Sequence, residues 1–440
     1  MAPRAFSSSR GAQHTESDVI QVLGSTWALM AGMLLLMVGN GLQGTLLGVR
    51  GGIEGFSTFE MSLVMSAYFL GFLGGSRMTP EMIRRVGHVR VFAALASFIS
   101  AVLILYPTIA NPWVWVALRV VIGFCFSGVY VTAESWLNHS VDNSKRGQAL
   151  SLYMITQMAG IVTAQGVIVL GDPSGFILFV VPSVLVSISF APILLSATPT
   201  PAFEATKPMS LRDLIRTSPL GSVGMFLTGG IYSGMFGMAA VYGSEVGLSV
   251  AQISTFVATI YLGGLICQFP IGWLSDRVDR RSLILLTAAA SGGASVVGGL
   301  FGWNYELLLV AAFFLGGASN PLYALLIAYT NDFLDHADMA AASGRMMFLN
   351  GIGAILGPIS MGWIMGVVGP SGFFAFMAIM GFALAGYAAY RMTQRAAPSV
   401  EDTGTYAPVL PSATAVVVEA AQEYFIEESE QADDGLSPAN

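Results

Sequence analysis

The stretch Gly272-Trp273-Leu274-Ser275-Asp276-Arg277-Val278-Asp279-Arg280-Arg281 links two long apolar segments, residues 253–274 and 283–303. Each segment has roughly 20 residues, enough for a helix to cross the hydrocarbon core of a bilayer. Arginine near the end of a membrane-spanning helix favours the cytoplasmic side. The stretch therefore predicts a cytoplasmic loop between two membrane-spanning helices.

The same pattern of apolar segments and basic connections extends along the whole chain. Twelve apolar segments can be read, and 17 of the 19 basic residues lie in even-numbered connections or in the two tails. Arg50 alone lies in an odd-numbered connection, and Arg119 lies inside a segment. Only 10% of the residues are charged, against about 25% in soluble domains. We predict an all-α membrane protein with 12 transmembrane helices and both termini in the cytoplasm.

The twelve segments divide into two similar sets of six. Gly123 and Tyr130 align with Gly316 and Tyr323 at an offset of 193 residues, on either side of the longest internal connection. Two pseudo-symmetric six-helix bundles are a known transporter plan, with the substrate site near the membrane midplane between them. The expected parts are a cytoplasmic N-terminal tail (1–24), an N-terminal bundle (25–196), a cytoplasmic central loop (197–219), a C-terminal bundle (220–391) and an acidic, disordered cytoplasmic tail (392–440).

Several classes of function have no support in the sequence. Nine acidic residues and no basic ones follow Arg395, and no basic cluster indicates nucleic acid. Cys125 and Cys267 lie in apolar segments without metal-binding spacing, so we expect no metal and no cofactor. No phosphate-binding loop is present, which argues against direct drive by ATP. No catalytic constellation lies at a plausible depth, and we do not expect an enzyme.

The residue 272–281 stretch resembles the G-x-x-x-D-R-x-G-R-R loop of the major facilitator superfamily, with Asp279 at the usual glycine. The string Ala133-Glu134-Ser135-Trp136-Leu137-Asn138 is similar to a poorly characterised bacterial branch of that family. The resemblance implies a monomer in the bacterial inner (plasma) membrane, whose charged loops help to close a cytoplasmic gate. The gate candidates are Gly272, Asp276, Arg277, Arg280, Arg281, Glu134, Arg146, Arg84 and Arg85.

Arg119 is the one basic residue within an apolar segment. An arginine at such depth costs roughly 2.5 kcal/mol or more, so it normally faces a cavity or a partner. Helical geometry places Phe126 and Tyr130 on the same face. Arg119 is therefore a candidate to bind a substrate carboxylate or to serve as an internal counter-ion. The alternative is that its side chain extends to the membrane surface.

Polar side chains interrupt several other apolar segments in both halves. An amide in lipid must find a partner or face water, so the set predicts a moderately polar central cavity. No Asp or Glu lies near the middle of a segment, so the usual proton carrier of coupled transporters is missing. The substrate-cavity candidates are Arg119, Asn40, Gln43, Tyr130, Gln157, Tyr232, Gln268, Asn320, Tyr323 and Asn350.

These features predict a secondary active transporter that moves a small organic solute across the inner membrane by alternating access. Its expected partners are the solute, the lipid bilayer and, as an open question, a coupling proton. One alternative is a proton-driven exporter of lipophilic compounds, which the 22 Met and 27 Phe would suit. A second alternative is a non-transporting sensor whose acidic tail binds a partner.

Overall fold

The computed structural model describes most of the chain. The described residues are 9–140, 146–192 and 209–394, together with Tyr406, Val409, Thr414 and Val418. For residues 9–25, 139–140, 146–147 and 336–337 it describes the backbone alone. All regular structure in these ranges is helical.

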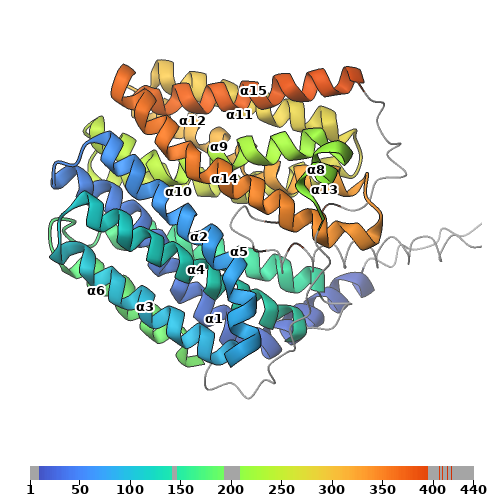
Figure 1. Ribbon diagram of the computed structural model, residues 1–440, viewed down its shortest axis with the longest axis horizontal. Coiled ribbons are helices and arrows are strands. Elements are labelled where there is room, and N and C mark those ends of the chain that lie inside the picture. The colour runs from blue at the N-terminus through green and yellow to red at the C-terminus, as the bar shows by residue number, and fades with distance from the viewer. Residues whose placement is uncertain are drawn as a thin grey trace, which may run out of the picture.

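Fourteen helices follow one another along the described chain (Figure 1). The first six are α1 (Ser9–Ile53), α2 (Thr58–Val86), α3 (His88–Thr108), α4 (Pro112–Ser140), α5 (Arg146–Ile168) and α6 (Ile177–Ser189). The others are α8 (Leu211–Thr217), α9 (Pro219–Glu245), α10 (Val250–Ser275), α11 (Arg280–Phe301), α12 (Tyr305–Ser319), α13 (Pro321–Asn331), α14 (His336–Val368) and α15 (Gly372–Gln394).

Ten stretches of the described chain are long and apolar enough to cross a membrane, which makes this a multi-pass membrane protein. Helices α12 and α13 together form one of them, and they meet at Pro321, which has no N–H for the helix ladder. Of the twelve predicted crossings, α2 is long enough but more polar, and α6 is apolar but has only 13 residues.

The helices lie in two groups (Figure 1). In one group α1 packs on α5 and α6, while α4 packs on α2 and α3. In the other group α9 packs on α14, α10 on α12, and α11 on α15. Contacts between the groups run from α2 to α14, from α1 to α9 and from α5 to α10. The interior between the groups is therefore bounded by helices from both halves of the sequence.

Glycines bring the backbones of α2 and α4 together. A methyl group added to Gly71 would overlap the Val120 carbonyl oxygen, and one added to Gly123 would overlap the Tyr68 carbonyl oxygen. Only a residue without a side chain permits this approach. The two helices therefore move as one unit.

The equivalent contact occurs between α10 and α12. Gly263 faces the Phe313 carbonyl oxygen and Gly316 faces the Ile260 carbonyl oxygen, at the offset of 192 to 193 residues found in the sequence. The helix starts repeat as well, since Ser249 closes a capping box at α10 as Ser57 does at α2. The internal repeat in the sequence thus corresponds to a repeat of helix–helix contacts.

Helix α14 also approaches its neighbour α9 through glycines. A methyl group on Gly353 would overlap the Phe226 carbonyl oxygen, and one on Gly357 would crowd Gly230 of α9. Pro358 lies within α14, one residue further along. The pair α9 and α14 is therefore held at the same close spacing as α2 and α4.

We expect Gly353→Ala to lower the stability of the purified protein by about 1–3 kcal/mol, because the new methyl group displaces a packed backbone. Gly366→Ala is the matched control on the same helix, since a methyl group there meets open space. Thermal unfolding in detergent measures both variants. Equal melting temperatures would contradict the close packing of α9 and α14.

Candidate functional site

A cavity of about 110 Å³ lies between the two helix groups. Helices α1, α2, α4 and α5 line it from one group, and α9, α10 and α14 line it from the other. Its wall is both aromatic and polar. Prominent lining residues are Asn40, Gln43, Thr45, Tyr68, Phe69, Phe72, Ser76, Arg119, Tyr130, Gln165, Tyr232, Phe236, Tyr261, Met347 and Asn350.

Six of the ten residues predicted from the sequence line this cavity. They are Arg119, Asn40, Gln43, Tyr130, Tyr232 and Asn350. Asn40 Nδ2 donates to the Tyr130 hydroxyl at 2.8 Å, which joins α1 to α4. Asn350 Nδ2 donates to the Met225 carbonyl oxygen at 3.1 Å. These amides thus connect helices as well as facing the cavity.

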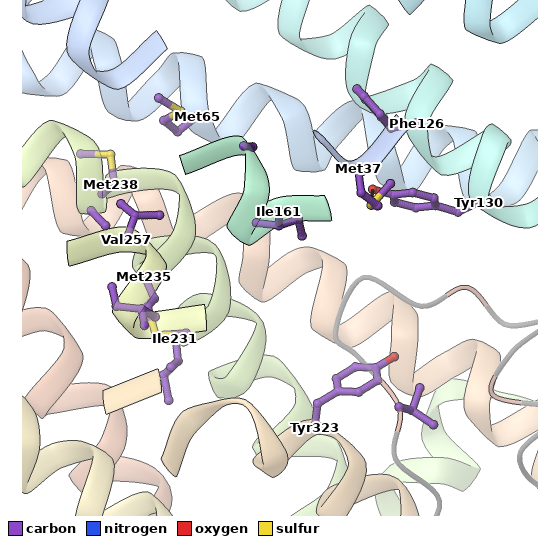
Figure 2. Packing of buried hydrophobic residues seen from close by; sticks show 14 of the residues in the cluster. Met37, Met65, Phe126, Tyr130, Ile161, Ile231, Met235, Met238, Val257 and Tyr323 are labelled. Carbon is purple, nitrogen blue, oxygen red and sulfur yellow. Dashed lines mark hydrogen bonds between the residues drawn. The ribbon is translucent and has the colours of Figure 1, made fainter. Parts of the chain in front are cut away.

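The other four predicted residues do not line the cavity. Gln268 donates to the hydroxyl of Tyr406 at 2.7 Å, and Gln157 is buried on α5. Asn320 and Tyr323 are buried near the junction of α12 and α13. Figure 2 shows Tyr323 well apart from Met37 and Tyr130. Polar residues in an apolar helix can serve helix packing instead of a cavity, and residue type alone does not separate the two roles.

Sequence reasoning missed several aromatic residues of the wall. Phe236 stacks on Tyr261 with ring centroids 4.1 Å apart, and Tyr68 lies against Arg119. On another side of the cavity, Thr45 donates to Gln165 Oε1 at 3.0 Å. The available signal for Tyr68 was a lone tyrosine within an apolar segment, which ordinary packing also produces. Tyr261, in contrast, belongs to the set of polar residues from which the sequence predicts the cavity.

Arg119 is 96% buried, since its exposed fraction is 4%, and its side chain does not reach the surface. The guanidinium Cζ lies 5.0 Å from the Tyr68 ring centroid, and Nη2 lies 3.1 Å from Met65 Sδ. Nε and Nη1 have no hydrogen-bond partner. None of the described residues that line the cavity is acidic. The described cavity wall therefore carries a positive charge and no acidic residue to balance it.

The two groups touch directly at the end of the molecule that holds the α1–α2 connection. A methyl group on Gly48 would meet Ala240, and one on Gly362 would meet Ser62. Ser66 Oγ donates to the Ile355 carbonyl oxygen across the same boundary. We call this end the α1–α2 seal.

The seal and the cavity follow one another along each of the helices that form both. On α2 the sealing residues 58–66 precede the lining residues 68–76. On α14 the lining residues 347–354 precede the sealing residues 355–362. On α1 and α9, as on α14, the lining residues precede the sealing residues. The seal therefore closes one end of the cavity.

The predicted gate loop lies at the opposite end and forms a charge network in its own half. Arg280 is buried and pairs with Asp332 at 2.5 Å and with Asp276 at 3.5 Å, which ties α11 to α13 and α10. Arg277 lies over the Trp273 ring, 4.1 Å from its centroid. Burial raises the pKa of Asp276, and the Tyr406 N–H and the Arg280 guanidinium oppose that rise.

Asp279 explains why this loop departs from the family pattern. It is the N-cap of α11 with φ −54°, and its carboxylate accepts from the Arg281 N–H at 3.2 Å. The equivalent Gly87 has φ +87°, a conformation that favours glycine. Because the second-half loop needs no positive φ, an aspartate can take the capping position there.

The first-half gate candidates have different contacts. Arg84 and Arg85 both pair with Glu81, at 2.5 and 2.6 Å, on the exposed surface of α2. Glu134 is buried at the end of α4 and accepts from the Tyr153 hydroxyl at 3.2 Å. The side chain of Arg146 lies outside the described residues.

Comparisons with known proteins agree on the fold. The sequence model of the Major Facilitator Superfamily matches residues 25–256 and 221–421. The uncharacterized MFS-type transporter YcaD of Escherichia coli O6:K15:H31 is 28% identical over 335 residues, covering 75% of this chain and 86% of YcaD.

Two solved structures are similar to this chain. The nucleoside transporter NupG has a TM-score of 0.67 at 14% identity, covering 84% of this chain and 98% of NupG. A bacterial homolog of the human lysosomal transporter Spinster, in an inward-facing and occupied conformation, has a TM-score of 0.66 at 16% identity, covering 94% of this chain and 98% of that chain.

The seal predicts a specific cross-link. A Cβ on Gly52 would lie 3.5 Å from Ser244 Cβ, within the range of a disulfide. We expect Gly52→Cys/Ser244→Cys to form an intramolecular disulfide on mild oxidation, measured by intact mass after thiol alkylation. The two single variants are controls. A double variant that stays fully reduced would contradict direct contact of α1 and α9 at this end.

Proposed function

We propose that this chain, which belongs to the Major Facilitator Superfamily, is a secondary active transporter that moves a small organic solute by alternating access. We further propose twelve crossings in two six-helix bundles, residues 25–196 and 220–391, with both termini in the cytoplasm of a bacterium. The observation that carries the proposal is a cavity that both halves line and whose α1–α2 end is sealed by direct contacts between the halves.

The orientation follows from the distribution of charge. Basic residues concentrate in the connections at the α10–α11 end, and this end is therefore assigned to the cytoplasm. The α1–α2 seal then faces outward, and the described conformation is inward-facing. Opening the seal while the opposite end closes would carry the cavity to the other side of the membrane.

In this proposal the side chains of the cavity have separate roles. Arg119 is the anchor for the solute, and Asn40 and Tyr130 offer hydrogen bonds from the N-terminal bundle. Tyr232 and Asn350 offer them from the C-terminal bundle. The Arg280 network holds α10, α11 and α13 together, so that the C-terminal bundle moves as a unit.

The exporter of lipophilic compounds remains the second candidate, and the aromatic wall favours it. Rings from Tyr68, Phe72, Phe236 and Tyr261 supply apolar surface. Proton drive would need a carboxylate, and the described lining residues include none. Drug resistance of an expressing strain against a panel of dyes separates the two candidates.

Proteoliposomes and a mixture of solutes test transport directly. A defined mixture of organic acids, amino acids, sugars and nucleosides is presented outside, and the lumen is analysed by mass spectrometry. We expect at least one member to enter through reduced Gly52→Cys/Ser244→Cys protein, to be excluded after oxidation and to enter again after reduction. Entry that is unaffected by the cross-link would contradict alternating access, and no entry of any member would favour the sensor.

Arg119 variants test the proposed anchor. We expect Arg119→Ala to reduce uptake of the identified solute at least tenfold and Arg119→Lys to retain part of it, because lysine keeps the charge but not the guanidinium geometry. Uptake is measured as initial rate per reconstituted protein. Unchanged rates in both variants would remove Arg119 from the mechanism.

A further inference from the structure

The sequence left open whether Arg119 is an internal counter-ion or binds solute, and its surroundings favour one of the two. A counter-ion needs an acid within reach, yet the lining contains none among the described residues. The partners that the guanidinium does have are a thioether sulfur and the face of a tyrosine ring. Both are weak substitutes for a carboxylate.

The geometry points to an organic monoanion with an apolar or aromatic body as the solute class, an inference that rests on the proposed function. Two of the three guanidinium nitrogens still lack a hydrogen-bond partner, although the side chain is 96% buried. A buried charge left unpaired is expensive, and one carboxylate from the ligand would neutralise it. Phe69, Phe72 and Phe236 would receive the rest of the molecule.

The described cavity lining holds one basic residue, Arg119, and no acidic residue, and this net charge of +1 determines which solute charge fits best. A neutral solute leaves the guanidinium unpaired, and a cationic one adds repulsion in a medium of low dielectric constant. A dianion leaves one of its own charges uncompensated in the cavity. The cavity thus selects for a single negative charge next to an apolar group.

Three probes of one shape test the inference by binding alone. Benzoate, benzamide and benzylamine differ at one substituent and carry a negative, a neutral and a positive charge. We expect benzoate to raise the melting temperature of the purified protein and to bind at least tenfold more tightly than either of the others. We expect Arg119→Gln to lose this preference and Arg119→Lys to keep part of it.

The outcomes separate the inference from the proposed function. The monoanion inference is overturned if benzamide or benzylamine binds as tightly as benzoate, or if benzoate does not bind. Transport of a neutral or cationic solute in the proteoliposomes would leave the proposed transporter function intact. Preserved benzoate preference in Arg119→Gln overturns the role of Arg119. If benzoate binding depends on Arg119 but no solute is transported, the inference about monoanion binding stands and the proposed transport function is rejected.

A second inference comes from four described residues of the C-terminal tail, which we call the tail strap: Tyr406, Val409, Thr414 and Val418. The sequence predicts disorder for the tail, yet all four are buried, and the rest of the tail lies outside the described residues. Val409 and Val418 join the hydrophobic core with exposed fractions of 2% and 1%. The strap is therefore packed against the helices at these points.

The contacts of the strap divide between the two halves. The Tyr406 N–H donates to Asp276 at 2.7 Å, its hydroxyl accepts from Gln268, and its ring lies on Gly272, all in or directly after α10. Eight residues later, the Thr414 N–H donates to Glu134 of α4 at 3.0 Å, and the Thr414 hydroxyl donates to the same carboxylate.

We infer that the tail strap is an autoinhibitory contact that links α10 of one bundle to α4 of the other at the cytoplasmic end. It donates hydrogen bonds to the buried carboxylate of Glu134 on one side and to the partly exposed carboxylate of Asp276 on the other, at the end of the molecule opposite the α1–α2 seal. When the bundles approach one another at this end, the strap must leave. Its binding therefore favours the described conformation over the opposite one and limits the rate of exchange.

Thiol labelling in the full-length chain tests the strap and requires no solute. Ser76 lines the cavity, and Ser76→Cys supplies the thiol to be labelled. The two native cysteines are removed by Cys125→Ser and Cys267→Ser. We expect Tyr406→Ala/Thr414→Val to lower the rate of labelling by a membrane-impermeant maleimide from the cytoplasmic side by about tenfold, because loss of the strap allows the cytoplasmic end to close. The matched control is Glu430→Gln, a tail substitution outside the strap.

A peptide added in trans distinguishes release of the strap from misfolding. We expect a synthetic peptide of residues 401–421 to restore faster labelling of the Tyr406→Ala/Thr414→Val protein, and the same peptide carrying Y406A to have no effect. An unchanged labelling rate in the double variant overturns the inference. Faster labelling of the double variant also overturns it, and so does slower labelling that neither peptide, or both peptides equally, can reverse.

Discussion

The structure depends on backbones that approach one another where glycine removes the side chain. In a bilayer the helices gain little from hydrophobic burial against each other, so their association rests on close packing and hydrogen bonds. Gly71 with Gly123, Gly263 with Gly316, and Gly353 against α9 supply that packing within each half. Close packing therefore joins the helices within each half, and the proposed transport cycle places the relative movement at the boundary between the halves.

The boundary itself has two different ends and a charged middle. At the α1–α2 seal, small residues such as Gly52 and Ser244 let the halves touch directly. In the middle, Arg119 holds a positive charge in a low-dielectric wall without an acid beside it. At the other end, Asp276 and Glu134 accept hydrogen bonds from the tail strap. In the proposed transport cycle, solute, seal and strap act on one equilibrium between the halves.

The family resemblance implies that the charged loop of residues 272–281 helps to close a gate between the halves, but its described ion pairs lie within the C-terminal half. Arg280 is satisfied by Asp332, Asp276 and Ser275, all within the C-terminal half. The corresponding loop of the first half has exposed pairs of Glu81 with Arg84 and Arg85, and its buried His88 contacts Ser135 of α4 at 3.0 Å. The loop therefore stabilises one bundle. On this side of the cavity the halves meet through Met154 and Met158 of α5 against Tyr261 and Leu265 of α10, and through the tail strap.

The sequence by itself determined the helical membrane architecture, the duplication and the presence of an arginine that cannot face lipid. These follow from segment length, charge distribution and repeated spacing, which are local properties. It did not determine which polar residues share a cavity. Asn40 and Asn320 look alike in their segments, yet Asn40 meets Tyr130 at the cavity while Asn320 is buried elsewhere. Tertiary structure decided this, and the docking of Tyr406, because helix rotation and long-range packing have no signature in the neighbouring residues.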